Sequence, residues 1–372
     1  MFRVVHITTV HTAKDVRIFH KECKTLASAD YEVFLIAQHD KKEVIDGVHI
    51  IPLPRVKGRL KRMVLLPFMG LIRALNLKAK VYHFHDPELL LAGILLKILT
   101  GKKIIYDIHE DYSKQILSKY YIPNVLRKGI AHAVRMIEYI SSLFFDSIVA
   151  ATDDIMKNFS YYKKAISVKN FPIIENFSNT IRIIDKDKDV FYLIYTGGLT
   201  ETRGIIQIVQ ALELVDSNNQ VKLILCGEFD PPDLEIKVRR LRGFEKVEYL
   251  GWVEHREILA LLSKADVGLV CLHPAINYIT SLPVKLFEYM IAGIPVIASN
   301  FPLWKEIIED NNCGICVNPL DPKEIAEAIR YLIEHPDIAR KMGENGRKAI
   351  LEKFNWENEN KKLLELYWKI LN

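Results

Sequence analysis

Short apolar runs alternate with longer amphipathic stretches along the first half of the chain. The short runs are rich in β-branched residues, and the longer ones repeat apolar positions every three or four residues, which is the period of a helix. Predicted strands cover residues 2–9, 32–37, 81–84, 103–107 and 147–151, and predicted helices cover residues 16–29, 88–99, 125–145 and 153–161. Strands that alternate with helices in this way predict a parallel sheet with helices on both faces.

The alternation lapses over residues 168–189, where the segment 185–189 (DKDKD) is interpreted as a linker. A second series follows. Its predicted strands are 191–195, 221–226, 247–250, 267–271 and 295–298, and its predicted helices are 204–215, 255–264, 284–292, 323–334, 338–352 and 357–371. The pattern predicts an α/β fold of two doubly wound, Rossmann-like parallel-sheet domains that face each other across a cleft. Ligands of such sheets bind beyond the carboxyl ends of the strands, so polar residues just after a strand are the first candidates for chemistry.

The composition is that of an ordinary globular protein. Of the 372 residues, 49% are hydrophobic and 26% are charged, and the five cysteines, an odd number, do not make a disulfide framework. No apolar run reaches the roughly 18–20 residues that span a bilayer. The N-terminus lacks the apolar core of a signal peptide. We therefore expect a protein of the reducing cytoplasm.

Charge is unevenly distributed along the chain. Residues 1–180 carry 27 basic and 17 acidic side chains, whereas the remaining residues carry more acidic than basic ones. The excess is largest over residues 47–85, which hold eight basic side chains and no acidic one around the apolar run 63–69. One interpretation is a core helix with solvated flanks. The other is a surface, residues 55–80, that meets an anionic membrane or a phosphorylated acceptor. No nucleic acid is expected, because no binding motif accompanies the charge.

A glycine-rich loop follows the first predicted strand of the second domain. In the segment 195–204 (YTGGLTETRG), Gly197 and Gly198 let the backbone approach a ligand, and the helix that begins there presents free N–H groups to phosphate. Arg203 can add a bidentate contact. The loop is neither G-x-G-x-x-G nor a Walker sequence, so it does not indicate a dinucleotide or ATP.

A second candidate lies on the predicted helix that begins after Pro283. Lys285 and Glu288 are three residues apart and therefore share one face of this helix. They are either a surface ion pair or a ligand site, in which the lysine binds phosphate and the glutamate accepts hydrogen bonds from ribose hydroxyls.

Histidines and carboxylates follow two predicted strands of the first domain. The segments 83–88 (HFHDPE) and 106–111 (YDIHED) both place histidine beside carboxylates. A metal site is not favoured there, because no matched set of tetrahedral ligands is readable in the sequence. We predict a polar wall with one catalytic or positioning histidine, name His109 and Asp86 as the catalytic candidates, and expect no metal.

Taken together, these motifs resemble the family 4 retaining glycosyltransferases, which have the GT-B fold. The resemblance covers nearly the whole chain. It is most specific at residues 283–290 (PVKLFEYM) and 293–296 (GIPV), with support at 106–110, 170–172, 250–252 and 265–267. It implies that the second domain binds a nucleotide-diphosphate-sugar and the first a glycan or lipid-linked acceptor. It also implies metal-independent, hexosyltransferase-type transfer with retained anomeric configuration, and no cofactor besides the donor.

The resemblance also assigns roles to individual residues. Glu288 holds the donor ribose, Arg203 replaces the usual lysine on the diphosphate, and His109 lies near the reacting sugar. The family's first donor-sugar glutamate falls on Thr280, and the arginine that usually follows the first loop glycine falls on Gly198. Asp15 and Arg17 are expected to supply polar contacts in the loop after the first strand, where the family has glycines.

The expected organisation is an acceptor domain at 1–170, a donor domain at 171–355 and a final helix at 356–372 that crosses back to the first domain. The expected role is synthesis of a cell-surface polysaccharide or glycolipid, by a cytoplasmic protein on the inner face of the membrane. Two other functions stay open. One is a nucleotide-sugar epimerase of the same architecture, which needs paired carboxylates around the sugar. The other is an inactive donor-binding scaffold, which Thr280 and Gly198 favour and which Arg203, Lys285, Glu288 and His109 oppose.

Overall fold

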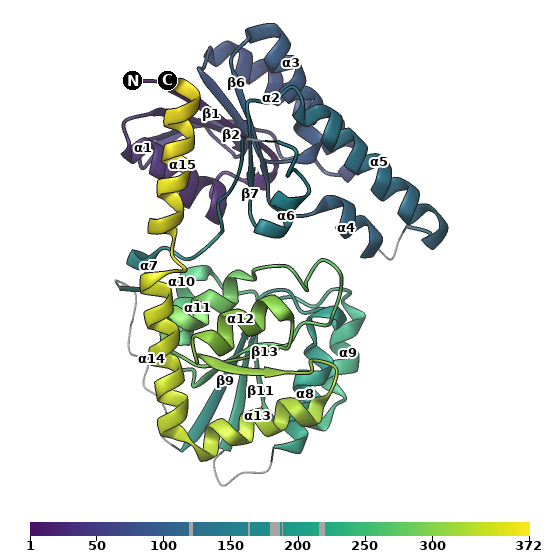
Figure 1. Ribbon diagram of the computed structural model, residues 1–372. Coiled ribbons are helices and arrows are strands. Elements are labelled where there is room, and N and C mark those ends of the chain that lie inside the picture. Colours follow the sequence, from purple (N-terminus) through teal and green to yellow (C-terminus); the bar gives the residue numbers. More distant parts are fainter. Residues whose placement is uncertain (119–121, 163, 179–186, 188, 216–219) are drawn as a thin grey trace. The chain divides into compact units, whose positions relative to one another are not determined.

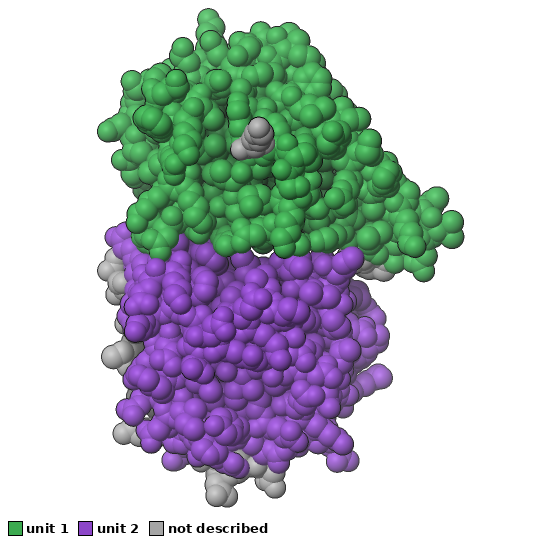
Figure 2. Space-filling model, in the orientation of Figure 1, with its two compact units in different colours: residues 1–170, 356–372 green, residues 171–355 purple. Residues whose placement is uncertain are grey.

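The computed structural model describes residues 1–118, 122–162, 164–178, 187, 189–215 and 220–372. The chain divides into two compact units, which Figure 2 shows in different colours. Unit 1 comprises residues 1–170 and 356–372, and unit 2 comprises residues 171–355. Most of the predicted linker at 185–189 lies outside the described residues.

Unit 1 is built on an eight-stranded sheet with the strand order β3-β4-β2-β1-β5-β6-β7-β8 (Figure 1). All neighbours are parallel except β3 and β4. The strands are β1 (Arg3–Thr12), β2 (Glu32–Gln38), β3 (Glu43–Ile45), β4 (Val48–Leu53), β5 (Val81–Phe84), β6 (Lys103–Ile108), β7 (Ser147–Ala150) and β8 (Ala165–Ser167). The five strands predicted in this unit are present. The sequence pattern missed β4 and the short strands β3 and β8.

The helical segments of unit 1 cover both faces of its sheet. They are η1 (Val16–Cys23), α1 (Lys24–Ser28), α2 (Arg59–Leu77), η2 (Pro87–Leu89), α3 (Leu90–Thr100), α4 (Tyr112–Ser118), α5 (Asn124–Ser142), α6 (Asp153–Lys157) and α15 (Trp356–Leu371). One face carries the apolar core, to which α2 and α3 contribute side chains. The strand alternation turns His6, His83 and Asp107 to the other face, where η1 and α15 cover them. Unit 1 therefore has one apolar layer and one layer with a polar, buried centre.

Helix α2 is only half buried. Leu66, Gly70, Leu71 and Ala74 face the core. Leu60, Val64, Phe68 and Ile72, each four residues after the one before, are 80%, 76%, 62% and 45% exposed. The helix packs against the core through one face, but its outer stripe is apolar, so a core helix with solvated flanks describes it only in part. Among the described residues, no helix is both long and apolar enough to cross a membrane.

Unit 2 is built on a six-stranded parallel sheet with the order β11-β10-β9-β12-β13-β14. The strands are β9 (Val190–Thr196), β10 (Gln220–Cys226), β11 (Val247–Gly251), β12 (Val267–Val270), β13 (Val296–Ser299) and β14 (Gly314–Val317). Successive β9 residues alternate between two apolar cores: Tyr192 and Ile194 belong to one, and Leu193 and Tyr195 to the other. A sheet buried on both faces is the property that makes a domain doubly wound, and the predicted fold class is confirmed.

The helical segments of unit 2 pack against these two cores. They are α7 (Ile174–Ser178), η3 (Glu201–Arg203), α8 (Ile205–Leu214), α9 (Asp233–Arg239), η4 (Arg242–Lys246), α10 (His255–Leu262), α11 (Val284–Ala292), α12 (Pro302–Asp310), α13 (Pro322–Glu334) and α14 (Pro336–Glu352). Helix α7 lies in the stretch 168–189, where the sequence pattern predicted no element. Its five residues are too few for helical periodicity to be recognised.

Candidate functional site

The glycine-rich loop of unit 2 leaves β9 in a conformation that only glycine adopts easily. Gly197 has a φ of +111°, and a Cβ placed there would lie 3.1 Å from Lys285 Nζ and 3.3 Å from Arg203 Nη1. At Gly204, with φ +74°, a Cβ would lie 2.0 Å from the Cys271 carbonyl oxygen. The first glycine therefore leaves room beside two cations, and the second lets α8 begin against the end of β12.

Lys285 and Arg203 bring two positive charges to this turn. The ammonium of Lys285 lies 3.7 Å from the centroid of the Tyr195 ring. Its Nζ is buried and has no hydrogen-bond acceptor among the described residues. Burial, and then the charge of Arg203, hold the pKa of Lys285 well below its usual value. Arg203 Nη1 donates to the Gly198 carbonyl oxygen at 3.4 Å. The turn thus brings two positive charges close together, which is the electrostatic condition for anion binding.

Helix α11 is held in place by Tyr289. The Tyr289 hydroxyl accepts a hydrogen bond from the Thr196 backbone N–H at 3.0 Å, and its ring packs against the backbone of Gly268. This anchor sets Lys285 one turn earlier beside the glycine loop. Glu288, 12% exposed, pairs with His255 Nε2 at 2.9 Å through its Oε1. Gly197, Gly198, Arg203 and Lys285 therefore come together, and Glu288 lies on the same helix.

Two residues of unit 2 were missed by the sequence analysis. His255 starts α10 and reaches Glu288 on α11, a contact between helices that no local pattern announces. Asn277 has a buried Oδ1 without a hydrogen-bond partner in the described part of the chain. It lies in the same loop between β12 and α11 as Thr280, which is half-buried. Thr280 stands where the family has a glutamate, and the Asn277 side-chain amide is a further polar group of the same loop.

In unit 1, Asp86 ties the loop after β1 to the end of β5. Its Oδ2 accepts hydrogen bonds from the Thr8 hydroxyl at 2.8 Å and from the backbone N–H groups of Thr9 and Val10 at 2.7 and 3.2 Å. Its Oδ1 lies 3.6 Å from His11 Nε2. Asp86 is 1% exposed. The structure therefore gives this carboxylate a positioning role for the loop and for His11.

His11 is a functional candidate that the sequence analysis did not name. Its Nδ1 lies 3.2 Å from Asp15 Oδ2, and its ring lies 5.3 Å from that of His109. Burial lowers the pKa of His11, but the hydrogen bond to Asp15 and the charge of Asp86 outweigh it, so the pKa is raised. His11 therefore carries a proton more readily than an ordinary histidine.

His109 is oriented by Asp107 at the end of β6. His109 Nε2 lies 2.9 Å from Asp107 Oδ2 and 3.3 Å from His85 Nδ1. Burial would raise the pKa of Asp107, but Arg17 and His109 outweigh it, so the pKa stays well below its usual value. Because the ionised carboxylate accepts from Nε2, Nδ1 is the ring nitrogen left to accept a proton or a hydrogen bond. This geometry suits a positioning or proton-handling histidine.

Arg17 does not offer the open loop contact that was expected of it. It is 3% exposed, and its guanidinium donates to both carboxylate oxygens of Asp107 at 2.9 and 3.0 Å and to the Val168 carbonyl oxygen at 2.8 Å. Its Nε also lies 3.0 Å from Glu22 Oε1. Arg17 is drawn inside because two buried carboxylates need a cation. Asp15 likewise turns inward and caps η1 by accepting from the N–H groups of Arg17 and Ile18.

Comparison with known proteins identifies the family. Residues 176–349 match the family model described as glycosyl transferases group 1, and residues 16–169 match glycosyltransferase family 4. The two models together cover most of both units, and the chain belongs to the family 4, group 1 glycosyltransferases. An uncharacterized glycosyltransferase of Methanocaldococcus jannaschii is 28% identical over 193 residues, which are 52% of this chain. The match covers 47% of that protein, so the chain spans about half the length of this relative.

Two solved structures share the fold of the whole chain. Sucrose-phosphate synthase from Thermosynechococcus elongatus aligns over 100% of this chain and 99% of its own, with a TM-score of 0.81 and 18% identity. Anabaena HepE in complex with UDP-glucose aligns over 99% of this chain and 100% of its own, with a TM-score of 0.72 and 14% identity. These similarities confirm the predicted GT-B fold.

Proposed function

We propose that this chain transfers a sugar from a nucleotide-diphosphate-sugar to a glycan or lipid-linked acceptor, with retained anomeric configuration. The observation that carries the proposal is the buried ammonium of Lys285, which has no acceptor among the described residues and lies beside Arg203 at the Gly197 turn. A diphosphate supplies hydrogen-bond acceptors and negative charge to Lys285 and Arg203. The family membership supports the proposal, as does HepE, whose structure was determined with UDP-glucose.

The same residues account for the chemistry of the leaving group. When the bond between the anomeric carbon and the diphosphate oxygen breaks, negative charge develops on the diphosphate. Lys285, Arg203 and the N–H groups at the start of α8 stabilise this charge, so the diphosphate itself needs no metal. The acceptor hydroxyl oxygen forms the new bond to the anomeric carbon, and its proton passes to the leaving diphosphate oxygen. Glu288 accepts a hydrogen bond from the donor ribose, and the family resemblance implies that His109 lies near the reacting sugar.

A binding and turnover experiment tests the proposal. Thermal unfolding of the full chain is measured with a panel of nucleosides, nucleoside diphosphates and nucleotide sugars. A ligand at 100 times its Kd adds about 2.7 kcal/mol to the free energy of unfolding. We expect one base series in which the diphosphates raise the melting temperature far more than the nucleoside does. Transfer from the matching nucleotide sugar is expected to proceed at an unchanged rate when EDTA is added to the assay.

The alternatives give different results in the same experiment. An epimerase exchanges a sugar C–H for deuterium from D₂O and produces the epimeric nucleotide sugar without acceptor. A scaffold binds the donor but shows no turnover with any acceptor. If no nucleotide stabilises the chain, or if EDTA abolishes transfer and manganese restores it, the proposed mechanism is wrong.

We also propose that unit 1 binds reversibly to anionic membranes through α2, which brings the protein to a lipid-linked acceptor on the cytoplasmic face. The exposed apolar stripe of Leu60, Val64 and Phe68 lies next to the exposed basic residues Lys57 and Lys61. This combination is typical of helices that lie in the membrane interface. Arg62, which the sequence analysis counted in the basic patch, instead pairs with Glu88 at 2.9 Å and is unavailable to lipid.

Co-sedimentation with phosphatidylserine-containing vesicles measures this binding. Changing Lys57 and Lys61 to Ser should weaken it by about 2 kcal/mol, roughly thirtyfold, since each basic residue near the surface contributes about 1 kcal/mol. Val64→Ser with Phe68→Ser should weaken it at all salt concentrations. Lys341→Ser with Lys348→Ser, two exposed lysines of unit 2, is the matched control. Binding that is absent in the wild type, or unchanged in both α2 variants, contradicts the proposal.

A further inference from the structure

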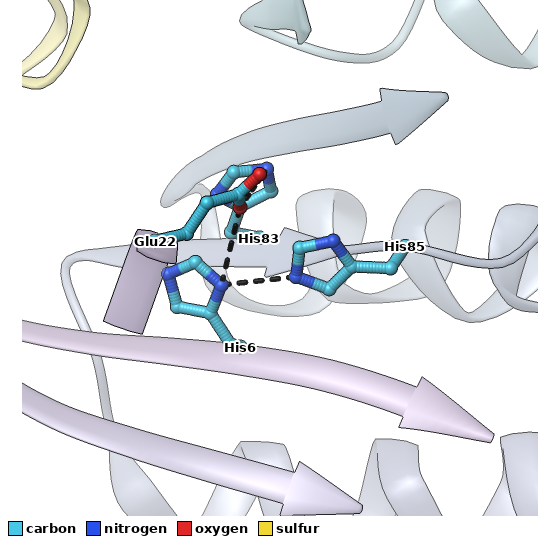
Figure 3. A group of neighbouring side chains, drawn as sticks. All are labelled: His6, Glu22, His83 and His85. Carbon is cyan, nitrogen blue, oxygen red and sulfur yellow. Dashed lines mark hydrogen bonds and ion pairs between the residues drawn. The ribbon is translucent and has the colours of Figure 1, made fainter. Parts of the chain in front are cut away.

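Three histidines and a glutamate meet on the polar face of the unit 1 sheet (Figure 3). His6 lies on β1, Glu22 on η1, His83 on β5, and His85 directly after β5. The register of β1 and β5 pairs His6 with His83, which places the two rings side by side on one face. All four side chains have 0% exposure. Each offers one ligand atom, and these four atoms lie within 4.8 Å of one another.

The spacing of the ligand atoms matches a small coordination sphere. His6 Nδ1 lies 2.9 Å from His85 Nε2 and 4.0 Å from Glu22 Oε2, and His83 Nε2 lies 3.9 Å from the same oxygen. Ligands about 2.0–2.2 Å from a tetrahedral zinc ion lie roughly 3.3–3.6 Å from one another. The observed separations bracket that range, so small side-chain shifts suffice to close the sphere.

In each of the three histidines, the ring nitrogen that faces away from the cluster has a polar partner. That contact decides whether the other ring nitrogen, which faces the cluster, keeps its lone pair. His85 Nδ1 lies 3.1 Å from the carboxylate of Asp107, which can only accept, so Nδ1 carries the proton and Nε2 keeps its lone pair. The Tyr367 hydroxyl of α15 lies 2.9 Å from His83 Nδ1 and 3.3 Å from His6 Nε2. Hydrogen bonds from these two nitrogens to the hydroxyl leave lone pairs on His83 Nε2 and His6 Nδ1. Such outer contacts are the usual support of metal-binding histidines.

The inner atoms have few protein partners. In the part of the chain that the structure describes, His83 Nε2 makes no hydrogen bond, and the Glu22 carboxyl group has Arg17 and Asp107 as its polar neighbours. A buried polar atom without a partner is costly. A divalent cation would satisfy three nitrogen lone pairs and one carboxylate oxygen at once, whereas a single shared proton satisfies only two of these atoms.

We propose that His6, Glu22, His83 and His85 form a binding site for a divalent transition metal, with zinc as the expected ion. Three imidazole nitrogens and one carboxylate oxygen suit zinc, and four protein ligands without an open position define a structural site. The metal would join β1, η1 and β5 and, through Tyr367, α15. This proposal is independent of the transferase function. Because the site is enclosed, a chelator added only during the transfer assay does not test it.

The experiment measures metal content in the untagged full chain by plasma mass spectrometry. After zinc loading and dialysis, we expect one zinc per chain. Glu22→Gln and His83→Gln, which keep the size of the side chain, should lose it. His49→Gln is the matched control, because His49 lies in the same sheet on β4 and stacks on Phe34 outside the cluster. A wild type that retains no zinc, or variants that retain as much as the wild type, would overturn the proposal.

A second measurement decides the question if the ligand variants fail to fold. Cobalt is titrated into the apoprotein, and a four-coordinate site gives the intense visible absorption that six-coordinate cobalt lacks. Tyr367→Phe leaves all four ligands in place but removes the outer contact, and should weaken the metal by roughly 10–100-fold. An absorption of the six-coordinate type, or an affinity that Tyr367→Phe leaves unchanged, counts against the site.

Discussion

Replacing Lys285 by methionine should weaken nucleoside diphosphate binding by one to two orders of magnitude and leave nucleoside binding nearly unchanged. The expected loss follows from one charged hydrogen bond, worth about 1.5–3 kcal/mol, or roughly 10–150-fold in Kd. The same substitution should not lower the stability of the ligand-free protein. The ammonium of Lys285 is buried beside Arg203 without an acceptor among the described residues, so the free variant should be at least as stable as the wild type.

Titration calorimetry with the base selected by the binding panel measures both ligands. Arg203→Met should likewise weaken diphosphate binding and leave nucleoside binding nearly unchanged, because Arg203 lies at the same turn. Lys305→Met on α12 is the control, since Lys305 is half exposed and pairs with Glu309. Equal losses for nucleoside and diphosphate would show that Lys285 supports the fold only. A large loss of stability in the free Lys285→Met protein would show that its ammonium has a partner.

The donor site was readable because its residues lie in two continuous segments. Gly197, Gly198 and Arg203 fall within seven residues, and Lys285 and Glu288 share one helix face, so local geometry already brings the members of each set together. The sequence did not show that the two segments meet. Their contact depends on β9 and α11 being joined through Thr196 and Tyr289, a contact 93 residues apart in the chain.

The polar centre of unit 1 could be predicted only in part. His83 lies near the end of a predicted strand and His85 and His109 follow strands, so they were noticed for that reason, and Asp107 was quoted only as part of a motif. His6 was taken as an ordinary strand residue and Glu22 as an ordinary helix residue. Their proximity to the others depends on β1 lying between β2 and β5, a strand order that periodicity does not reveal. The inward turn of Arg17 was missed for the same reason, because its partners are 90 and 151 residues away.

Some elements were missed for local reasons instead. Strand β3 has three residues and pairs antiparallel at the sheet edge, so it is too short to show alternation. Helix α2 was only one of two interpretations of the run 63–69, because Pro67 and apolar residues on both its buried and exposed faces hide the amphipathic pattern. In both elements the tertiary context, not the local propensity, determines the structure.

The second large effect is expected at Arg17. Arg17→Met removes the cation that pairs with Asp107 and Glu22, whose side chains are both fully buried. Breaking a buried ion pair from one side typically costs about 3–5 kcal/mol, because the remaining charge stays in a medium of low dielectric. Because about 1.4 kcal/mol corresponds to a factor of ten in an equilibrium constant, unit 1 should open at least a hundredfold more often in this variant.

Hydrogen exchange read by mass spectrometry resolves the two units. Peptides of β6 in unit 1 should lose protection in Arg17→Met, whereas peptides of β9 in unit 2 serve as an internal reference. Arg3→Met is the matched control, because Arg3 lies on β1 and pairs with Glu32 at 3.0 Å with both side chains about one-third exposed. Such a pair is worth at most about 1 kcal/mol.

A double variant tests the electrostatic cause directly. Asp107→Asn removes the charge that Arg17→Met leaves unpaired, so the two changes together should cost less than the sum of their separate effects. This non-additivity is expected because Asp107 receives two hydrogen bonds from the Arg17 guanidinium. Strictly additive losses, or a loss of protection in Arg17→Met no greater than in Arg3→Met, would mean that the packing of the arginine stem, and not its charge, holds this layer of unit 1 together.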